Sequence, residues 1–393
     1  MESLLTPPTL HIGCCITPHG LGHAARACAV MEELSRRMPV HYKIVSTAPT
    51  WFFAESLTVS YTLYPLQTDV GLVQHDALRE DLDQTVEQLH AFYPLQTELL
   101  DQLAALFADC RLVLCDIAPI GIAAAAQARK QYGAEVKSVL LENFTWDWIY
   151  QSYLASHPEF EEVIHYLQGL YRQADYHIQA EPVCAPGKAD LLAPPISRAC
   201  QQRRQKVRKT LELREDEKAV LVTMGGIGGT ELPLARMRLC KDFCFILPGQ
   251  GRRKIEREGN LFFLPSDSAI RHPDLVAACD AVIGKVGYST LAEIYQAGIP
   301  FAYISREWFR ESLPLADFIA REMPSLPLTE EEFREKDMLA ILTRLCRLPR
   351  QGRRKESGAS LVADFLHKLL DGLTSPACRI LKENRPASPD AGS

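Results

Sequence analysis

The sequence lacks the features that mark several large classes of protein. Its 393 residues carry 43 basic and 49 acidic side chains, giving a net charge of −6, so no basic field favours nucleic acid or an anionic membrane. No apolar run reaches the length of about 18 residues needed for a membrane-spanning helix, and the start, MESLLTPPTL, lacks the basic region of a signal peptide. We therefore expect a cytoplasmic protein with no nucleic-acid partner and at most peripheral membrane contact.

Cysteines with metal-binding spacing are also missing. The 12 cysteines are scattered along the chain, and none form a C-x-x-C pair. This distribution favours neither a zinc site nor a disulfide framework. We expect buried free thiols instead.

The length allows two domains, and short apolar runs that alternate with helical stretches are typical of α/β proteins. We predict an N-terminal domain (1–185), a proline-rich linker (186–197), a C-terminal domain (198–372) whose last helix packs back on the first, and a disordered tail (373–393). Each domain should be Rossmann-like and doubly wound, and the two should face a cleft. The predicted strands are 10–17, 42–45, 111–115, 136–140 and 176–179, the last closing the first sheet, then 219–223, 244–247, 261–264, 281–283 and 301–304. The predicted helices include an insertion over 77–108, two helices within 151–173, and helices at 198–211, 329–346 and 356–371.

A turn between strand 281–283 and the helix that begins at Ser289 or Thr290 gives the strongest site signal. Free backbone N–H groups and the helix macrodipole at such a position favour phosphate oxygens. Gly287 lets a ligand approach the backbone, and Lys285 adds a full positive charge. The alternative is an ordinary α/β turn in which Ser289 and Thr290 only cap the helix.

A second turn of this kind lies near the start of the chain. Strand 10–17 leads through Gly20 and Gly22 into a helix whose first turn carries His23 and Arg26 on one face. The glycines match a loose dinucleotide fingerprint, but the second strand ends in Ser-Thr-Ala-Pro without the acidic residue that NAD requires. His23 should lie at the carboxyl end of the first strand, where open α/β sheets bind ligands, although a purely structural histidine is the alternative.

These two turns resemble motifs of GT-B glycosyltransferases. The run from Cys279 to Glu293, followed by Ala-Gly-Ile-Pro, is similar to their donor-site signature, as in the peptidoglycan N-acetylglucosaminyltransferase. The G-x-G-H-x-x-R run from Gly20 to Arg26 is similar to their first turn, and to that of the nucleotide-sugar hydrolases of pseudaminic acid synthesis. The stretches TAPTWFF, DVGLVQ and NFTWDWIY resemble the N-terminal region of plant arabinose kinases and of predicted bacterial glycosyltransferases, without implying sugar phosphorylation.

The resemblance implies a nucleotide-sugar donor bound mainly by the second domain. It places the ribose on Glu293, the nucleobase near residues 264–266 and Ile270, and the diphosphate on the glycine turns. In the family an acidic residue and a glutamine often bind hydroxyls of the donor sugar at this position. This chain has Arg306 and Glu311 there instead. The alternative to a role in sugar binding is that these charged side chains only form the solvent-exposed start of a helix. The residues implied on the donor side are Gly225, Gly226, Lys285, Gly287, Tyr288, Ser289, Thr290, Glu293, Arg306 and Glu311.

The first domain is expected to hold the acceptor. Asp116 follows the buried strand 111–115 and is either a base or a cap for the next helix. The aromatic residues of 143–150 suit either sugar stacking or a domain interface. The residues expected in the cleft of this domain are His19, Gly20, Gly22, Arg26, Asn143 and Trp146.

We therefore predict a hexosyl-type glycosyltransferase that moves a sugar from a nucleotide-sugar, with a UDP-sugar favoured, to an unknown acceptor hydroxyl. His23 or Asp116 would be the base. The helix dipole and Lys285 could offset the charge of the leaving diphosphate, so no metal and no cofactor are expected. Two alternatives stay open: a hydrolase in which His23 activates water, and a non-catalytic nucleotide-sugar-binding protein.

Overall fold

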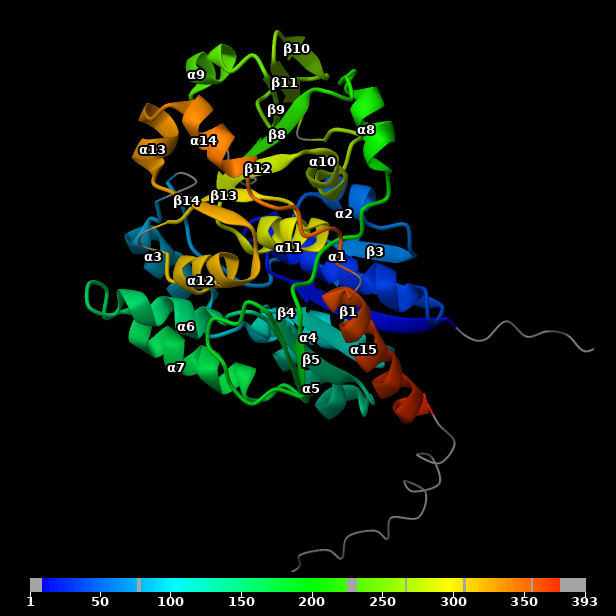
Figure 1. The fold of residues 1–393 in the computed structure, drawn as a ribbon. Coiled ribbons are helices and arrows are strands. Elements are labelled where there is room, and N and C mark those ends of the chain that lie inside the picture. Colours follow the sequence, from blue (N-terminus) through cyan, green and yellow to red (C-terminus); the bar gives the residue numbers. More distant parts are fainter. Residues whose placement is uncertain are drawn as a thin grey trace, which may run out of the picture.

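A computed structural model describes residues 9–75, 79–224, 232–265, 267–306, 309–354 and 356–374, and the statements below concern these residues. Two mainly parallel sheets with helices between their strands lie one above the other in Figure 1. This arrangement confirms the predicted α/β class with two doubly wound units. The predicted disordered tail lies outside the described residues from position 375 onward.

The first sheet and its helices form what we call the first half. Its seven described strands are parallel in the order β3-β2-β1-β4-β5-β6-β7. The chain moves outward from β1 in one direction and from β4 in the other, so the switch point falls between β1 and β4. The strands are β1 (Leu10–Ile16), β2 (Val40–Val45), β3 (Tyr61–Tyr64), β4 (Leu112–Asp116), β5 (Lys137–Glu142), β6 (Tyr176–Ala180) and β7 (Leu191–Ala193).

Local sequence signals set the ends of several helices of this half. Helix α5 has Pro119 in its first turn and ends at Gly133, whose φ of 63° suits glycine. The helices are α1 (Leu21–Ser35), α2 (Thr50–Ser56), α3 (Leu82–Phe92), α4 (Thr97–Phe107), α5 (Pro119–Tyr132), α6 (Trp146–Tyr150), the 3₁₀ turn η1 (Gln151–Tyr153) and α7 (Phe160–Tyr171).

The second half repeats the same plan. Its described strands lie in the order β10-β11-β9-β8-β12-β13-β14, with only β10 antiparallel to its neighbour, and the switch point falls between β8 and β12. The strands are β8 (Lys218–Thr223), β9 (Phe243–Pro248), β10 (Glu256–Glu258), β11 (Leu261–Leu264), β12 (Ala281–Lys285), β13 (Phe301–Ile304) and β14 (Ser325–Leu328). The helices are α8 (Arg204–Thr210), α9 (Leu234–Leu239), α10 (His272–Ala278), α11 (Tyr288–Ala297), α12 (Ser312–Glu322), α13 (Glu330–Glu335), α14 (Met338–Leu345) and α15 (Gly358–Thr374).

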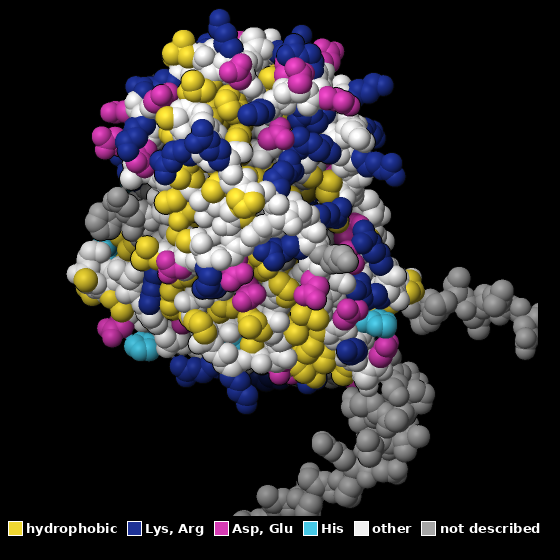
Figure 2. Space-filling view, viewed as in Figure 1, with side chains coloured by type: hydrophobic (Ala, Val, Ile, Leu, Met, Phe, Trp, Pro, Cys, Tyr) yellow, Lys and Arg dark blue, Asp and Glu magenta, His cyan; other side chains and the backbone are white. Residues whose placement is uncertain are grey.

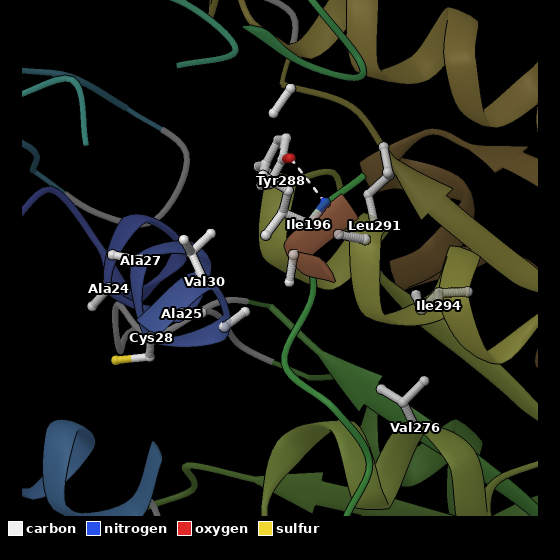
Figure 3. Close-up of a cluster of buried hydrophobic side chains, with 14 of the residues drawn as sticks. Ala24, Ala25, Ala27, Cys28, Val30, Ile196, Val276, Tyr288, Leu291 and Ile294 are labelled. Carbon is white, nitrogen blue, oxygen red and sulfur yellow. Dashed lines mark hydrogen bonds between the residues drawn. The ribbon is translucent and has the colours of Figure 1, made fainter. Parts of the chain in front are cut away.

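One hydrophobic cluster joins the two halves (Figure 3). Small buried side chains of α1, such as Ala25, belong to the same cluster as Tyr288 and Leu291 of α11, and the Tyr288 hydroxyl accepts a hydrogen bond from the backbone of Ile196 at 3.1 Å. The small residues let the two helices pack closely. Helix α15 packs on α1 and β7, so the end of the described chain lies on the first half.

Several predicted elements were wrong in detail. Strand 176–179 is not the last of the first sheet, because β7 lies beyond β6, inside the range predicted as linker. The helix predicted at 198–211 begins only at Arg204, and the helix predicted at 329–346 is two helices, since Asp337 caps a new start by accepting from the backbone of Leu339. Strands β3, β10 and β14 were not predicted.

Charged side chains of both signs are interspersed over the face shown in Figure 2, with Lys and Arg most numerous over its upper part. None of the described helices is both long enough and apolar enough to cross a membrane.

Candidate functional site

A cavity of about 710 Å³ lies between the two halves, at the carboxyl ends of the strands in both sheets. The loops after β1 and β12 both line it, so it lies at both switch points, where doubly wound sheets bind ligands. The predicted site residues that line the cavity are His19, Gly20, Gly22, His23, Lys285, Gly287, Tyr288, Ser289, Thr290, Glu293, Arg306 and Glu311. Gly225 and Gly226 lie outside the described residues.

The N-termini of α1 and α11 meet at the cavity. A Cβ atom on Gly22 would lie 3.6 Å from Oγ of Ser289. Neither helix start has a side-chain cap, and Gly20, which precedes α1, adopts a φ of 73° that favours glycine. The first N–H groups of a helix have no partner within it, so each helix start carries a partial positive charge. Two such helix starts therefore line one cavity, together with Lys285.

His23 and Asp116 form a hydrogen-bonded pair at the switch point of the first sheet. Asp116 ends β4, beside Ile16 at the end of β1, and its Oδ1 lies 2.8 Å from Nδ1 of His23. Burial alone would raise the pKa of the Asp116 carboxyl, but the charges and hydrogen bonds of Arg26 and His23 lower it below its ordinary value. Because an ionised carboxylate only accepts, Nδ1 of His23 donates, which leaves Nε2 as the basic nitrogen of a side chain that lines the cavity.

Arg26 lies behind this pair and connects it to the second half. Its Nε donates to Oδ2 of Asp116 at 2.9 Å and its Nη2 to Oδ1 at 2.6 Å, a bidentate ion pair. Its Nη1 donates to Oδ1 of Asn143 at 2.6 Å, and Nδ2 of Asn143 donates to Oε1 of Glu311 at 2.9 Å. A continuous chain of hydrogen bonds therefore runs from His23 to a residue of the second half.

Four residues expected at the cleft or as a base are buried behind the cavity wall: Arg26, Asp116, Asn143 and Trp146. Asp116 therefore supports His23 from behind, and the alternative that it caps α5 is also wrong, since that helix has no side-chain cap. Trp146 packs against His19, Phe144 and Tyr150 inside the first half, which leaves no ring face for a sugar.

The interface alternative for the aromatic residues of 143–150 is confirmed at Trp148, and Asn143 of the same segment also contacts the second half. Asn143 bonds Glu311 of the second half, as described above. The guanidinium of Arg310, also in the second half, lies 4.0 Å from the centre of the Trp148 ring.

Glu293 is buried in a cluster of charged residues that the sequence did not reveal. Its Oε1 accepts from Nη2 of Arg198 at 3.2 Å, and its Oε2 lies 2.5 Å from Nδ1 of His272. Burial would raise the pKa of the Glu293 carboxyl, but Arg198 and His272 lower it below its ordinary value. Arg198 fell inside a predicted helix, and no spacing in the sequence links it to Glu293.

Arg306 and Glu311 are buried and line the cavity, so the alternative of a solvated helix start is wrong. The Arg306 guanidinium lies 3.6 Å from the centre of the Phe309 ring, and its Nη1 lies 3.5 Å from Oε1 of Glu80. Burial lowers the pKa of Arg306 below its ordinary value.

One D-x-D spacing, which is common at metal-binding donor sites, occurs at Asp81-Leu82-Asp83 and is not part of the cavity lining. Asp81 caps α3 by accepting from the backbone of Gln84, and the Asp83 side chain is 97% exposed. Within the described part of the chain, no three His, Cys, Asp or Glu side chains are arranged to hold a metal ion.

Asp69 is a buried carboxyl group of the first half, and its protonation should make the stability of the fold depend on pH. Its carboxyl group accepts from Thr17 Oγ1 at 2.7 Å and from Trp146 Nε1 at 3.3 Å, and burial raises its pKa from 3.8 to about 7. Between these two values the folded protein holds a proton that the unfolded chain has lost. The free energy of unfolding must therefore decrease as the pH rises through this window.

Asp69→Asn is expected to remove this dependence, because the amide stays neutral. Relative to the wild type, the variant should gain about 3 kcal/mol in free energy of unfolding between pH 5 and pH 8. Urea denaturation at several pH values measures the difference. Asp83→Asn, at an exposed carboxylate, is the matched control and should follow the wild type. Parallel curves for Asp69→Asn and the wild type would show that Asp69 is ionised throughout.

Comparison with known proteins identifies the fold. No family model matches the chain. The structure of the calicheamicin glycosyltransferase CalG4 is similar over 94% of this chain and 100% of CalG4, with a TM-score of 0.60 and 13% sequence identity. UGT2 of Phytolacca americana is similar over 93% of this chain and 100% of UGT2, with a TM-score of 0.60 and 12% identity. MurG of Acinetobacter baumannii is similar over 91% of this chain and 99% of MurG, with a TM-score of 0.52 and 13% identity. The chain therefore has the GT-B fold, as the sequence motifs predicted.

One curated relative is similar at the level of sequence. L-arabinokinase of Arabidopsis thaliana is 29% identical over 315 residues, which is 75% of this chain. The chain spans only 28% of the length of that relative. The expected resemblance to plant arabinose kinases is thereby confirmed.

Proposed function

We propose that the protein transfers a sugar from a nucleotide-sugar, with a UDP-sugar favoured, to an acceptor hydroxyl. The observation that carries this proposal is the position of His23. Its side chain, held by Asp116, lines the same cavity as the N-terminus of α11 in the other half. The two halves thus contribute a candidate base and a candidate diphosphate site, and one ligand in the cavity could contact both.

The donor would extend along the second half. Glu293 would bind the ribose hydroxyls, and the diphosphate would lie on the N-terminus of α11 beside Lys285 and the turn that contains Gly225 and Gly226. The sugar would then point toward Arg306 and Glu311. Residues 198–372 would act as the donor domain, and residues 1–185 would hold the acceptor beside His19, Gly20 and Gly22.

In this reaction Nε2 of His23 takes the proton from the acceptor hydroxyl. The acceptor oxygen forms a bond to the anomeric carbon while the bond from that carbon to the diphosphate oxygen breaks, and the diphosphate keeps the electron pair. Asp116 stabilises the imidazolium that forms, and the α11 N-terminus with Lys285 stabilises the charge on the leaving diphosphate. These groups could do so without a metal.

The relatives suggest which donors to assay first. The structure of UGT2 from Phytolacca americana is a complex with UDP-2-fluoroglucose and pterostilbene, and the curated relative is named for arabinose. UDP-glucose and UDP-arabinose are therefore the first donors to test. Because the chain spans only 28% of the arabinokinase, we do not propose that it phosphorylates arabinose.

A donor-only assay on the wild type tests the proposal against the two alternatives. A transferase should bind the UDP-sugar and release free sugar only slowly until an acceptor is added. Rapid stoichiometric release without acceptor would show a hydrolase in which His23 activates water. Binding without turnover, with or without a panel of hydroxyl acceptors, would support a non-catalytic nucleotide-sugar-binding protein. Absence of any nucleotide binding would overturn all three.

Glu293→Ala provides the matched binding control for that assay. Loss of the carboxylate should weaken UDP binding in calorimetry by about 1–3 kcal/mol, the usual cost of losing a charged hydrogen-bond partner. Glu322→Ala changes a carboxylate at the end of α12, which is not part of the cavity lining, and should bind UDP as the wild type does. Unchanged affinity in Glu293→Ala would remove the ribose assignment.

A further inference from the structure

One end of the cavity is suited to the nucleobase of the proposed donor. The second half lines this end with residues that follow β9 and β11, including Gly249, Pro265 and Ile270. Arg271 and His272 come directly after Ile270, and His272 contacts Glu293, the proposed ribose ligand, at 2.5 Å. We call this region the base end, and it lies on the opposite side of α11 from Arg306 and Glu311 in the strand order of the sheet.

Helix α2 of the first half is fixed against the base end. Glu55 lies 3.5 Å from Nη1 of Arg198 and 3.9 Å from Nε of Arg271. Nη1 of Arg198 also donates to Oγ of Ser56 at 2.9 Å, while the other nitrogens of that guanidinium hold Glu293. Figure 1 shows α2 beside α10, in agreement with these contacts.

Trp51 lies one helical turn before Glu55, on the same face of α2. Its side chain lines the cavity and is 36% exposed, whereas its neighbour Phe52 is buried. The Arg198 guanidinium lies 4.7 Å from the centre of the Phe52 ring, and the Trp51 and Phe52 rings are 5.7 Å apart, edge to face. The indole therefore packs on Phe52, which contacts Arg198, a partner of Glu293, and it lines the same cavity as the proposed ribose site.

We propose that Trp51 stacks on the nucleobase and closes the base end from the first half. The inference rests on the proposed function, because it requires a nucleotide on Glu293. Aromatic stacking suits this position because any base offers a flat apolar face, and Pro265 and Ile270 add apolar surface to the same cavity. The nucleotide is then bound by both halves of the molecule, and Trp51 is a binding residue that the motifs of the second half do not include.

Calorimetry with the full chain tests this inference, with UDP as probe and GDP, ADP, CDP and dTDP beside it. Trp51→Leu should weaken binding of the tightest of these nucleotides about 5- to 100-fold, the range for losing one aromatic stack on a base. Trp51→Phe keeps an aromatic face and should bind within about threefold of the wild type. Inorganic pyrophosphate has no base, and it should bind Trp51→Leu and the wild type equally.

Tryptophan fluorescence gives a second readout on the same samples. The nucleotide should quench emission from the wild type, and Trp51→Leu, which keeps the other three of the four tryptophans, should lose most of that effect. If Trp51→Leu binds the nucleotide as tightly as the wild type, the stacking inference is wrong while the proposed function stands. If the wild type binds no nucleoside diphosphate at all, the proposed function fails, and this inference fails with it. Equal losses of pyrophosphate and nucleotide binding in Trp51→Leu would show a general structural defect and also overturn the stacking role.

Discussion

Replacing His23 by alanine is expected to lower the rate of sugar transfer by about 10² to 10⁴, the usual contribution of a positioned general base. The reason is that His23 lines the cavity with one nitrogen bonded to Asp116 and the other available to an acceptor hydroxyl. Donor binding should change little, because His23 is not among the proposed donor ligands. Steady-state rates and calorimetry with UDP, measured on the same variant, separate the two effects.

His41→Ala is a suitable control for this measurement. His41 lies at a half-buried position on β2, where it contacts Ser60 and Thr62 away from the cavity lining, and its removal should leave transfer unchanged. A His23→Ala variant that transfers sugar at the wild-type rate would exclude His23 as the base. A variant that loses UDP binding as strongly as turnover would show that His23 is instead a donor ligand.

Replacing Arg26 by methionine is expected to cost about 3–5 kcal/mol of free energy of unfolding, because it leaves the buried Asp116 carboxylate without its cation. Asp116 is fully buried, and Arg26 supplies two of its hydrogen bonds. The pKa of the Asp116 carboxyl is lowered in the folded protein, so this pair stabilises the fold above the ordinary aspartate pKa. That stabilisation should be lost as the pH falls through the lowered value.

Arg37→Met, two residues after the end of the same helix, is the matched control, since Arg37 pairs at 2.7 Å with Asp364, whose side chain is 52% exposed. That loss should cost no more than about 1 kcal/mol. The double variant Arg26→Met with Asp116→Leu removes both buried charges and should recover most of the stability lost in Arg26→Met. Urea denaturation near neutral pH measures all three. Equal losses for Arg26→Met and Arg37→Met would contradict the importance of the buried pair.

The sequence predicted those parts of the fold that depend on local pattern. Buried strands such as β4 and β12 are short apolar runs followed by a polar residue, and parallel sheets covered on both faces produce that pattern. The two glycine turns were found for the same reason, since a helix start after a strand has a local signature. Strand β7 was missed because it has only three residues and lies among prolines.

The contacts that define the candidate site could not be predicted in this way. His23 and Asp116 are 93 positions apart, and they meet only because β1 and β4 are neighbours in the sheet. Sequence spacing correctly placed Arg26 on the same face of α1 as His23. It did not reveal that Arg26 is buried behind the cavity wall while His23 lines the cavity. Trp146 resembled a sugar-stacking residue because residue type alone does not distinguish a buried aromatic from an exposed one.

The position of α15 affects how the chain can fold during synthesis. This helix is the last described element, yet it packs on α1, the first helix, and on β7. While the ribosome is still adding the second half, the matching apolar surface of α1 has no partner and stays open to water. The N-terminal half therefore cannot reach its final packing before the C-terminal residues emerge, and a chain cut before Gly358 would present that surface to chaperones and to other unfinished chains.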